Sequence, residues 1–221
     1  AVILDLEDAV AIAEKPATRA KVVAALRTPR TGLGYIRVNA ISTEFCHGDI
    51  QAVVAKGVDG IILPKVEAAH ELKTIDWLIG ELERERGLPI GGKGAMGGID
   101  LIPIIETAKG MQAVHEIAAA GTRTRRMAFG AGDFTLDMNM TWSRDETELL
   151  APRVAVVQAS RAAGIEPPID TVWADLNDVE GFKASAVRCR ALGFQGKMCI
   201  YPPQVTVVND VFTPGPAEIA L

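Results

Sequence analysis

Acidic side chains recur directly after short apolar runs of the sequence. These acids are Glu7, Asp8, Glu106 and Asp133. If the apolar runs are parallel strands of a barrel, their carboxyl ends lie on one face, where barrel enzymes gather their chemistry. Two bare carboxylates about 4 Å apart repel by roughly 4 kcal/mol at an effective dielectric constant of 20. Such a pair therefore needs a proton or a bound cation.

Oxygen donors favour a hard divalent cation, so the sequence predicts Mg²⁺, with Mn²⁺ possible, rather than zinc. We expect His47 in a loop and His70 and His115 in helices, so no histidine is placed at a strand end. The alternative for Glu106 is that it only caps a helix beginning at Thr107. The spacing alone leaves both interpretations open.

Two further features of the same strand ends favour an anionic ligand. Arg37 offers a planar, permanently charged fork to a carboxylate or a developing enolate. Its alternative is a structural ion pair, which is also the alternative for Lys65 and Lys197. The segment FGAGD at residues 129–133 can form a turn whose backbone N–H groups point at an anion.

Alternating strands and helices must position these side chains. Apolar runs bounded by turn residues predict strands at residues 2–6, 35–39, 60–63, 101–105, 127–130, 169–173 and 197–201. Helical patterns occupy residues 16–27, 67–86, 107–120, 145–163 and 178–192. The alternation indicates an α/β fold, and we predict a single TIM (β/α)8 barrel domain over residues 1–221, with the first βα unit missing from this sequence. An open doubly wound sheet is the alternative.

Composition excludes several classes of protein. The net charge of −5 argues against a nucleic-acid partner, because phosphate binding requires a basic face. The three cysteines contain no CxxC pair and indicate a reducing cytoplasm. No apolar run approaches the roughly 20 residues of a membrane span. The GxGxxG within GGKGAMGG at residues 91–98 precedes a strand, so it is interpreted as a connector rather than a dinucleotide site.

Six ordered motifs carry a resemblance to a known family. They are ILDLEDAV at 3–10, RVN at 37–39, GIILPKVE at 60–67, PIIETAKG at 103–110, FGAGDFTLD at 129–137 and GKMCIYPPQV at 196–205. Together they resemble the HpcH/HpaI aldolase/citrate lyase family, of the phosphoenolpyruvate/pyruvate TIM-barrel superfamily. The family includes citrate lyase β subunits and citryl-, malyl- and citramalyl-CoA lyases, and it is related to metal-dependent pyruvate aldolases.

The resemblance implies a metal-dependent site with defined roles. Glu106 and Asp133 would be the direct Mg²⁺ ligands, and Glu7 and Asp8 would hold water on the metal. The backbone N–H groups around Gly132 and Asp133 would bind the carboxylate of a keto acid.

The resemblance also implies the reaction. A 3-hydroxyacyl-CoA thioester would be cleaved to acetyl-CoA, or a related acyl-CoA, and a 2-keto acid. Arg37 would lie near the scissile bond and stabilise the enolate of the departing thioester. A pyruvate aldolase acting on a free hydroxy-keto acid is one alternative, and a non-catalytic subunit that binds metal and keto acid is another.

Two departures from the family pattern matter. Tyr201-Pro202 stands where relatives usually have His-Pro, which removes an imidazole that titrates near neutral pH. Relatives also carry a further N-terminal strand and a C-terminal segment that can close over a neighbouring subunit's site. The resemblance further implies a homo-oligomer, a trimer or hexamer, and an acyl-carrier subunit is a possible partner in place of free CoA.

Overall fold

Seven parallel strands form one curved sheet in the computed structural model, which describes residues 1–93 and 97–219. The strands are β1 (Val2–Asp5), β2 (Gly34–Arg37), β3 (Gly60–Leu63), β4 (Asp100–Ile105), β5 (Ala128–Phe129), β6 (Ile169–Asp170) and β7 (Gly196–Lys197). Each strand pairs with the next along the chain, so the order is β1-β2-β3-β4-β5-β6-β7. This consecutive parallel order is that of a (β/α) barrel and excludes the doubly wound alternative, whose strand order reverses.

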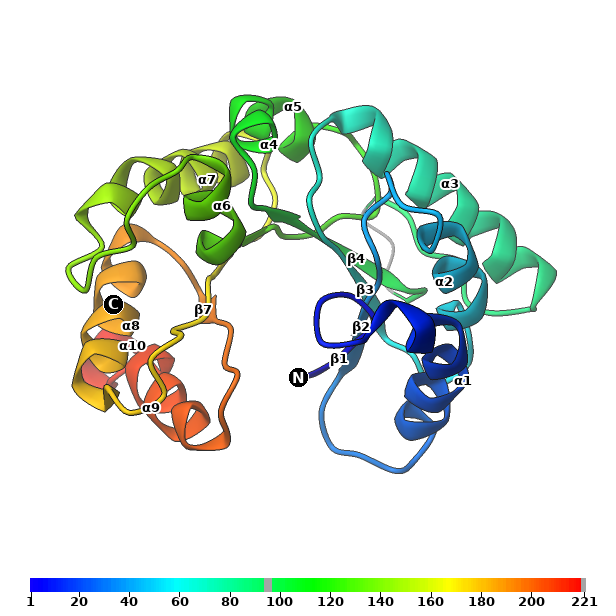
Figure 1. The fold of residues 1–221 in the computed structure, drawn as a ribbon, viewed down its shortest axis with the longest axis horizontal. Helices are drawn as coiled ribbons and strands as arrows, with labels where there is room; N and C mark the ends of the chain where they lie inside the picture. Colours follow the sequence, from blue (N-terminus) through cyan, green and yellow to red (C-terminus); the bar gives the residue numbers. More distant parts are fainter. Residues whose placement is uncertain (94–96, 220–221) are drawn as a thin grey trace.

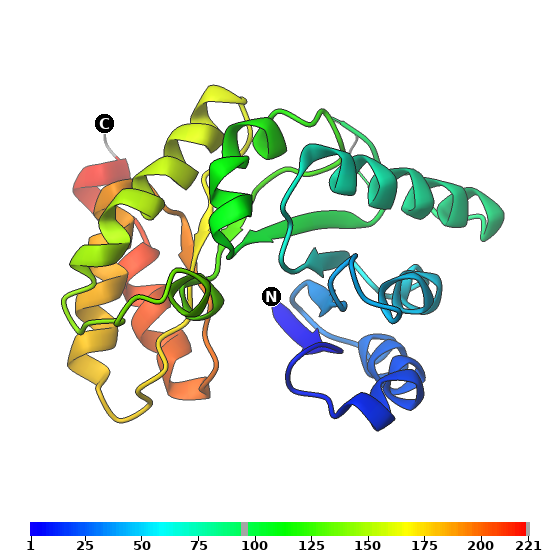
Figure 2. The ribbon, with the colours of Figure 1, turned by 45° about the horizontal axis from the view of Figure 1, so that its top comes forward.

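Helices follow the strands, and the longer helices lie outside the curve of the sheet, so that the whole forms an open arc (Figures 1 and 2). They are α1 (Lys15–Leu26), α2 (Cys46–Val53), α3 (Ala69–Glu85), α4 (Ala108–Gln112), α5 (Val114–Ala118), α6 (Ala131–Asp137), α7 (Leu150–Ala162), α8 (Val179–Leu192), α9 (Pro202–Phe212) and α10 (Pro216–Ile219). Two short 3₁₀ helices lie at Ile12–Glu14 and Thr147–Leu149. Among the described helices, none has the length and apolarity needed to cross a membrane.

The seven strands lie where the sequence predicts them, but some helices differ. The pattern at residues 107–120 forms two helices, α4 and α5, that meet at Ala113. The helix expected from residue 145 begins only at Leu150, because Glu146 has a left-handed backbone with φ of 53°. The glycine-rich segment 91–98 leads into β4, as expected of a connector, although its residues 94–96 lie outside the described part.

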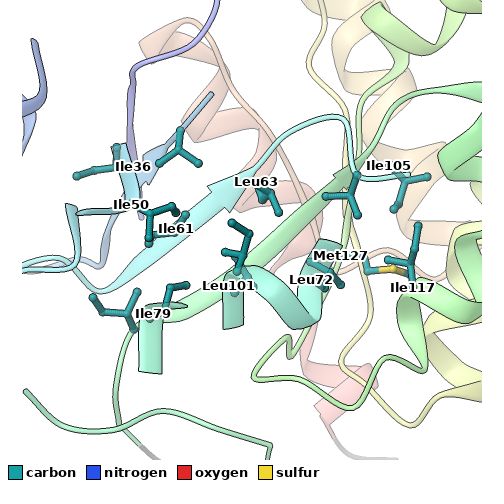
Figure 3. Close-up of a cluster of buried hydrophobic side chains, with 14 of the residues drawn as sticks. Ile36, Ile50, Ile61, Leu63, Leu72, Ile79, Leu101, Ile105, Ile117 and Met127 are labelled. Atoms are coloured by element: carbon teal, nitrogen blue, oxygen red, sulfur yellow. The ribbon is translucent and has the colours of Figure 1, made fainter. Parts of the chain in front are cut away.

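The main core lies between the sheet and the outer helices (Figure 3). Alternate strand residues point outward and share one buried cluster with α3 and α5 (Figure 3); the strands supply Ile61, Leu63, Leu101 and Ile105, and the helices supply Leu72, Ile79 and Ile117. The intervening residues point to the inner side of the sheet, where Tyr35, Ile62, Ile102 and Ile104 form a second cluster. Burying each such aliphatic side chain contributes about 1.5–3 kcal/mol, so the core fixes the strands whose ends carry the acidic residues.

A buried group of charges ties the last two strands to α7. Asp170 of β6 accepts hydrogen bonds from Arg153 Nε at 2.9 Å and from Lys197 Nζ of β7 at 2.7 Å. Arg153 also donates to Glu146 Oε1 at 2.8 Å, and Arg188 reaches the other oxygen of Glu146 at 3.0 Å. All these partners except Arg188 have almost completely buried side chains. Lys197 is therefore a structural ion-pair partner.

Acid should weaken this group of charges through Glu146. Burial raises the pKa of Glu146, but the hydrogen bond and charge of Arg153 outweigh it and hold the pKa at about 2, below the ordinary 4.5. A lowered carboxyl pKa stabilises the fold above pH 4.5, and this stabilisation is lost as the pH falls towards 2. We expect Glu146→Gln to cost about 3 kcal/mol at pH 7, and less at pH 3, in urea unfolding.

The matched control is Glu218→Gln, which removes a half-exposed partner of Arg190. This change should alter the free energy of unfolding by less than about 1 kcal/mol. An equal loss for both variants would contradict the role assigned to Glu146.

Candidate active site

Charged side chains from five segments converge at the carboxyl ends of β1 to β5. Lys65, which follows β3, connects them: its Nζ lies 2.5 Å from Glu7 Oε1 and 2.9 Å from Asp133 Oδ2. Its backbone N–H donates to Glu106 Oε1 at 2.9 Å. Arg37, at the end of β2, lies 2.8 Å from Glu7 Oε2. The structure thus brings together the acids and the arginine selected from the sequence, with Lys65 among them.

The turn after β1 is held in place by side chains and carries Glu7. Asp5 accepts the backbone N–H groups of Glu7 and Ala9, both at 3.0 Å. From α1, Lys15 Nζ donates to the carbonyl oxygens of Leu6 at 3.0 Å and Glu7 at 2.6 Å. These bonds fix the backbone on both sides of Glu7, so its side chain points to the site with little freedom.

Glu106 directly follows β4 as a buried carboxylate and does not cap the next helix. The cap of α4 is Thr107, whose Oγ1 accepts the N–H of Gly110 at 3.0 Å. Glu106 is only 4% exposed. Burial and, next, the negative charge of Asp133 raise the pKa of Glu106 to about 7. Glu106 and Asp133 both contact Lys65, through its backbone N–H and its Nζ, so two negative charges meet at one residue, a situation that a bound cation relieves.

Gly130 leaves the space that Glu106 occupies. A Cβ added at Gly130 would collide with Glu106 Oε2 and would lie 3.0 Å from Ile104 Cγ2. Because Gly130 has a φ of −113°, the glycine is required here by close approach rather than by its backbone conformation.

We expect Gly130→Ala to displace the Glu106 carboxylate and weaken Mg²⁺ binding at least about tenfold, a loss of roughly 1.4 kcal/mol, measured by calorimetry. The control is Gly196→Ala in β7, where the nearest atoms, both of Ile169, lie 3.9 Å from the added Cβ. Unchanged Mg²⁺ affinity in the folded Gly130→Ala protein would exclude Glu106 as a ligand held by this packing.

Arg37 is clamped by Asp5, the residue opposite it in the register of β1 and β2. Its Nε donates to Asp5 Oδ1 at 2.8 Å and its Nη2 to Asp5 Oδ2 at 2.7 Å. The remaining nitrogen, Nη1, lies towards Glu7 and, at 3.7 Å, Asp8. Burial acts to lower the pKa of Arg37, but Asp5 and the other acids raise it, so the guanidinium stays charged.

The structural and functional interpretations of Arg37 thus apply to different nitrogen atoms. Asp5 uses one edge of the guanidinium, and Nη1 is left facing the acidic residues. Asp5 was not among the predicted site residues. The available signal was an acid and an arginine near the ends of consecutive predicted strands, but the register that pairs them came only from the structure.

The segment FGAGD begins a helix instead of forming an isolated turn, so that expectation is wrong in detail. The helix α6 starts at Ala131, whose N–H donates to Thr171 Oγ1 at 2.8 Å. Gly132 and Asp133 are the next residues of its first turn. N–H groups in a first turn have no acceptor within the helix, so these two retain the donor capacity that was expected of the turn.

Tyr201 and the histidines lie away from these contacts. Tyr201 is the N-cap residue of α9 and is 44% exposed. His70 lies in α3 and His115 in α5, as predicted, whereas His47 lies in α2 and not in a loop. The short helix α2 was missed because residues 46–53 contain Gly48, a poor helix former, and lack a strong start signal.

The donor set fits a hard divalent cation that keeps several waters. Within residues 1–93 and 97–219, no three His, Cys, Asp or Glu side chains are already arranged as a metal cluster. Glu106 and Asp133 supply two carboxylates, and Glu7 Oε2 is a buried oxygen that lacks a well-aligned hydrogen bond despite lying 2.8 Å from Arg37. Mg²⁺ is commonly held by one or two carboxylates, with water and substrate completing its shell.

Comparisons with known proteins agree with this geometry. The sequence model of the HpcH/HpaI aldolase/citrate lyase family matches residues 1–202. Citrate lyase subunit beta of Leuconostoc mesenteroides subsp. cremoris is 40% identical over 220 residues, covering 99% of this chain and 70% of the relative. The L-malyl-CoA/beta-methylmalyl-CoA lyase of Rhodobacter capsulatus is 35% identical over 239 residues, covering 98% of this chain and 73% of the relative.

A solved structure is similar as well. The citrate lyase beta subunit of M. tuberculosis complexed with oxaloacetate and magnesium superposes with a TM-score of 0.77 at 32% identity, covering 96% of this chain and 86% of that one. Because the family sequence model and these relatives match nearly the whole length, the chain belongs to the HpcH/HpaI aldolase/citrate lyase family.

Proposed function

We propose that the protein is a Mg²⁺-dependent carbon–carbon lyase that cleaves a 3-hydroxyacyl-CoA to acetyl-CoA, or a related acyl-CoA, and a 2-keto acid. The observation that carries this proposal is the convergence of three carboxylates, those of Glu7, Glu106 and Asp133, on Lys65 at the strand ends. Burial and then the charge of Asp133 raise the pKa of Glu106, and Arg37 lies 2.8 Å from Glu7 Oε2. The relatives, a citrate lyase beta subunit and a malyl-CoA lyase, support the same reaction class.

Glu106 and Asp133 are the proposed metal ligands, with Mn²⁺ as a possible substitute for Mg²⁺. When bound, the ion supplies Lewis acidity at the substrate oxygen that becomes the ketone. Glu7 and Asp8 lie on the side of the site near Lys65 and Arg37, where they can orient water. Their fixed positions reduce the reorganisation needed when substrate binds.

Hydrogen-bond donors of the backbone and of Arg37 would hold the organic part of the substrate. The N–H groups of Gly132 and Asp133 would bind the keto-acid carboxylate. Arg37 would donate from Nη1 to the thioester oxygen as it gains enolate charge, while Asp5 fixes the plane of the guanidinium. A donor placed where charge develops lowers the barrier more than it strengthens substrate binding.

The two alternatives differ in ways that experiments can separate. A pyruvate aldolase would accept a free hydroxy-keto acid and commonly relies on a histidine base at a strand end, whereas His47, His70 and His115 lie on helices. A non-catalytic subunit would bind metal and keto acid without turnover. Tyr201, which replaces the usual family histidine, favours this second alternative, whereas the grouping of Glu106, Asp133 and Arg37 favours the enzyme.

The deciding experiment measures keto-acid binding and thioester cleavage on one preparation. Oxaloacetate, pyruvate and glyoxylate are titrated by calorimetry with and without Mg²⁺, and citryl-, malyl- and citramalyl-CoA are tested for release of keto acid. Binding only with Mg²⁺, together with cleavage of one thioester, supports the lyase. Binding without cleavage of any thioester, whether CoA or acyl-carrier, supports the non-catalytic alternative. Absence of Mg²⁺ binding at millimolar concentration overturns the proposal.

We further propose that the protein works in a reducing cytoplasm as a homo-oligomer. Cys46, Cys189 and Cys199 are free thiols, in keeping with a reducing cytoplasm. A homo-oligomer, trimer or hexamer, follows from the resemblance, and light scattering on the purified protein would measure its mass. An acyl-carrier subunit, as the thioester donor in place of CoA, would be recognised by cleavage of the carrier-bound thioester alone.

A further inference from the structure

Lys65 has an unusual backbone for a residue with a long side chain. Its φ of 51° lies in the left-handed region of backbone conformation, which residues other than glycine rarely adopt. This conformation directs the N–H of Lys65 to Glu106 Oε1 at 2.9 Å, and the side chain of the same residue reaches Glu7 and Asp133. Strained backbone is retained where surrounding contacts determine it, and here the contacts are with the carboxylates of the site.

The Lys65 ammonium group acts as a counter-ion to the acids. It lies 2.5 Å from Glu7 Oε1, 2.9 Å from Asp133 Oδ2 and 3.8 Å from Asp8 Oδ2. Glu7 is only 5% exposed, and one of its oxygens already lacks a well-aligned hydrogen bond. Among the described residues, removing the ammonium would therefore leave the buried carboxylate of Glu7 with Arg37 as its remaining positively charged partner within 4 Å.

The same ammonium is positioned to oppose a divalent cation. A metal held by Asp133 would share that carboxylate with Lys65, and two cations a few ångströms apart repel. Lys65 has a second set of partners available, because Glu7 is already bound and the mostly exposed Asp8 lies at 3.8 Å. The side chain of Lys65 can therefore move towards Glu7 and Asp8, and its positive charge remains paired with negative charge after the move.

From these contacts we propose that Lys65 is a positioning residue: it holds Glu7 and Asp133 in the metal-free site and yields Asp133 when the divalent cation binds. This inference rests on the proposed metal site and makes Lys65 a competitor of the metal ion for Asp133. Lys65 thus stabilises the fold without metal and lowers the affinity for metal, two effects of opposite sign. A purely structural lysine would affect only the first, and a substrate-binding lysine would instead change keto-acid affinity.

The test compares Mg²⁺ binding and thermal unfolding in two variants. Lys65→Met removes the ammonium and keeps a side chain of similar shape. Lys65→Gly removes the ammonium and accepts the left-handed backbone without strain, so the N–H bond to Glu106 is retained. Both should bind MgCl₂ about tenfold more tightly by calorimetry, because the competing cation is gone. Both should also unfold at a lower temperature without metal and show a larger rise in Tm on adding Mg²⁺.

The control is Lys109→Met, which removes a positive charge paired with Glu67, 2.9 Å away, at the start of α4. Its Mg²⁺ affinity should equal that of wild type. Unchanged or weaker Mg²⁺ binding in both Lys65 variants, with normal binding by wild type, overturns this inference and leaves the proposed function intact. Failure of the wild-type protein to bind Mg²⁺ instead overturns the proposed metal site, so the two failures are distinguishable.

Discussion

Glu106→Gln should abolish Mg²⁺-dependent keto-acid binding and lower kcat/KM at least about 10³-fold, because the Lewis acidity of a bound ion contributes several kcal/mol. The change preserves shape and removes one negative charge from a residue that is 4% exposed. Calorimetry with oxaloacetate and Mg²⁺ measures the binding, and keto-acid release from the preferred thioester measures the rate. Retention of Mg²⁺ affinity within about threefold would exclude Glu106 as a ligand, since this is less than 1 kcal/mol.

The same variant should be more stable than wild type in the absence of metal. Burial, followed by the charge of Asp133, raises the pKa of Glu106 to about 7 from an ordinary 4.5. A carboxyl group with a raised pKa disfavours the folded state as it ionises, so wild-type stability falls between pH 4.5 and 7 and then remains level. Glu106→Gln should lack this fall and gain up to about 3 kcal/mol at pH 8 in urea unfolding with EDTA.

A matched control uses the neighbouring acid Glu67, which follows β3 and pairs with the exposed Lys109. Glu67→Gln should leave Mg²⁺ affinity, turnover and the pH dependence of unfolding close to wild type. Loss of metal binding in both variants would indicate a general effect of negative charge at the strand ends rather than a defined ligand.

The positions of the main acids were predictable because parallel strands bring their carboxyl ends to one edge. Glu106 follows β4, the clearest apolar run of the sequence. The neighbouring strand β5 comes shortly before Asp133. Apolar runs also gave the seven strands, since a sheet covered on both faces requires continuous hydrophobic segments. The helix α6 was not predicted because its first turn contains glycine, which disfavours helices in general but is tolerated at a terminus.

Contacts that depend on register and backbone conformation were not predictable from the sequence. The pairing of Asp5 with Arg37 requires β1 and β2 to align without an offset, and a shift of one residue would place the two side chains on opposite faces. The left-handed conformation of Lys65 could not be predicted, because the position holds neither glycine nor asparagine, the residues that usually indicate it. The buried group around Arg153 joins residues far apart in sequence, and composition alone cannot pair them.

Arg37→Lys should lower kcat at least about 10²-fold while leaving Mg²⁺ affinity close to wild type, as expected for the loss of a donor aimed at developing charge. Lysine carries the same charge but cannot bond Asp5 with two nitrogens and still present a third to the substrate. KM for the thioester should change much less than kcat, because the lost interaction strengthens in the transition state. Steady-state kinetics with a saturating metal concentration measure both quantities.

Asp5→Asn tests whether the clamp on Arg37 matters for the rate. Asn can accept from only one of the two nitrogens, Nε and Nη2, that Asp5 holds at 2.8 and 2.7 Å. The guanidinium should then lose its fixed plane, and kcat should fall about tenfold, or 1.4 kcal/mol, with little change in Mg²⁺ binding. In the double variant with Arg37→Lys, the two losses should not add, because Asp5 acts through Arg37. Fully additive losses would show that Asp5 acts on the rate through another residue, and unchanged kcat in both single variants would make the Asp5–Arg37 pair purely structural.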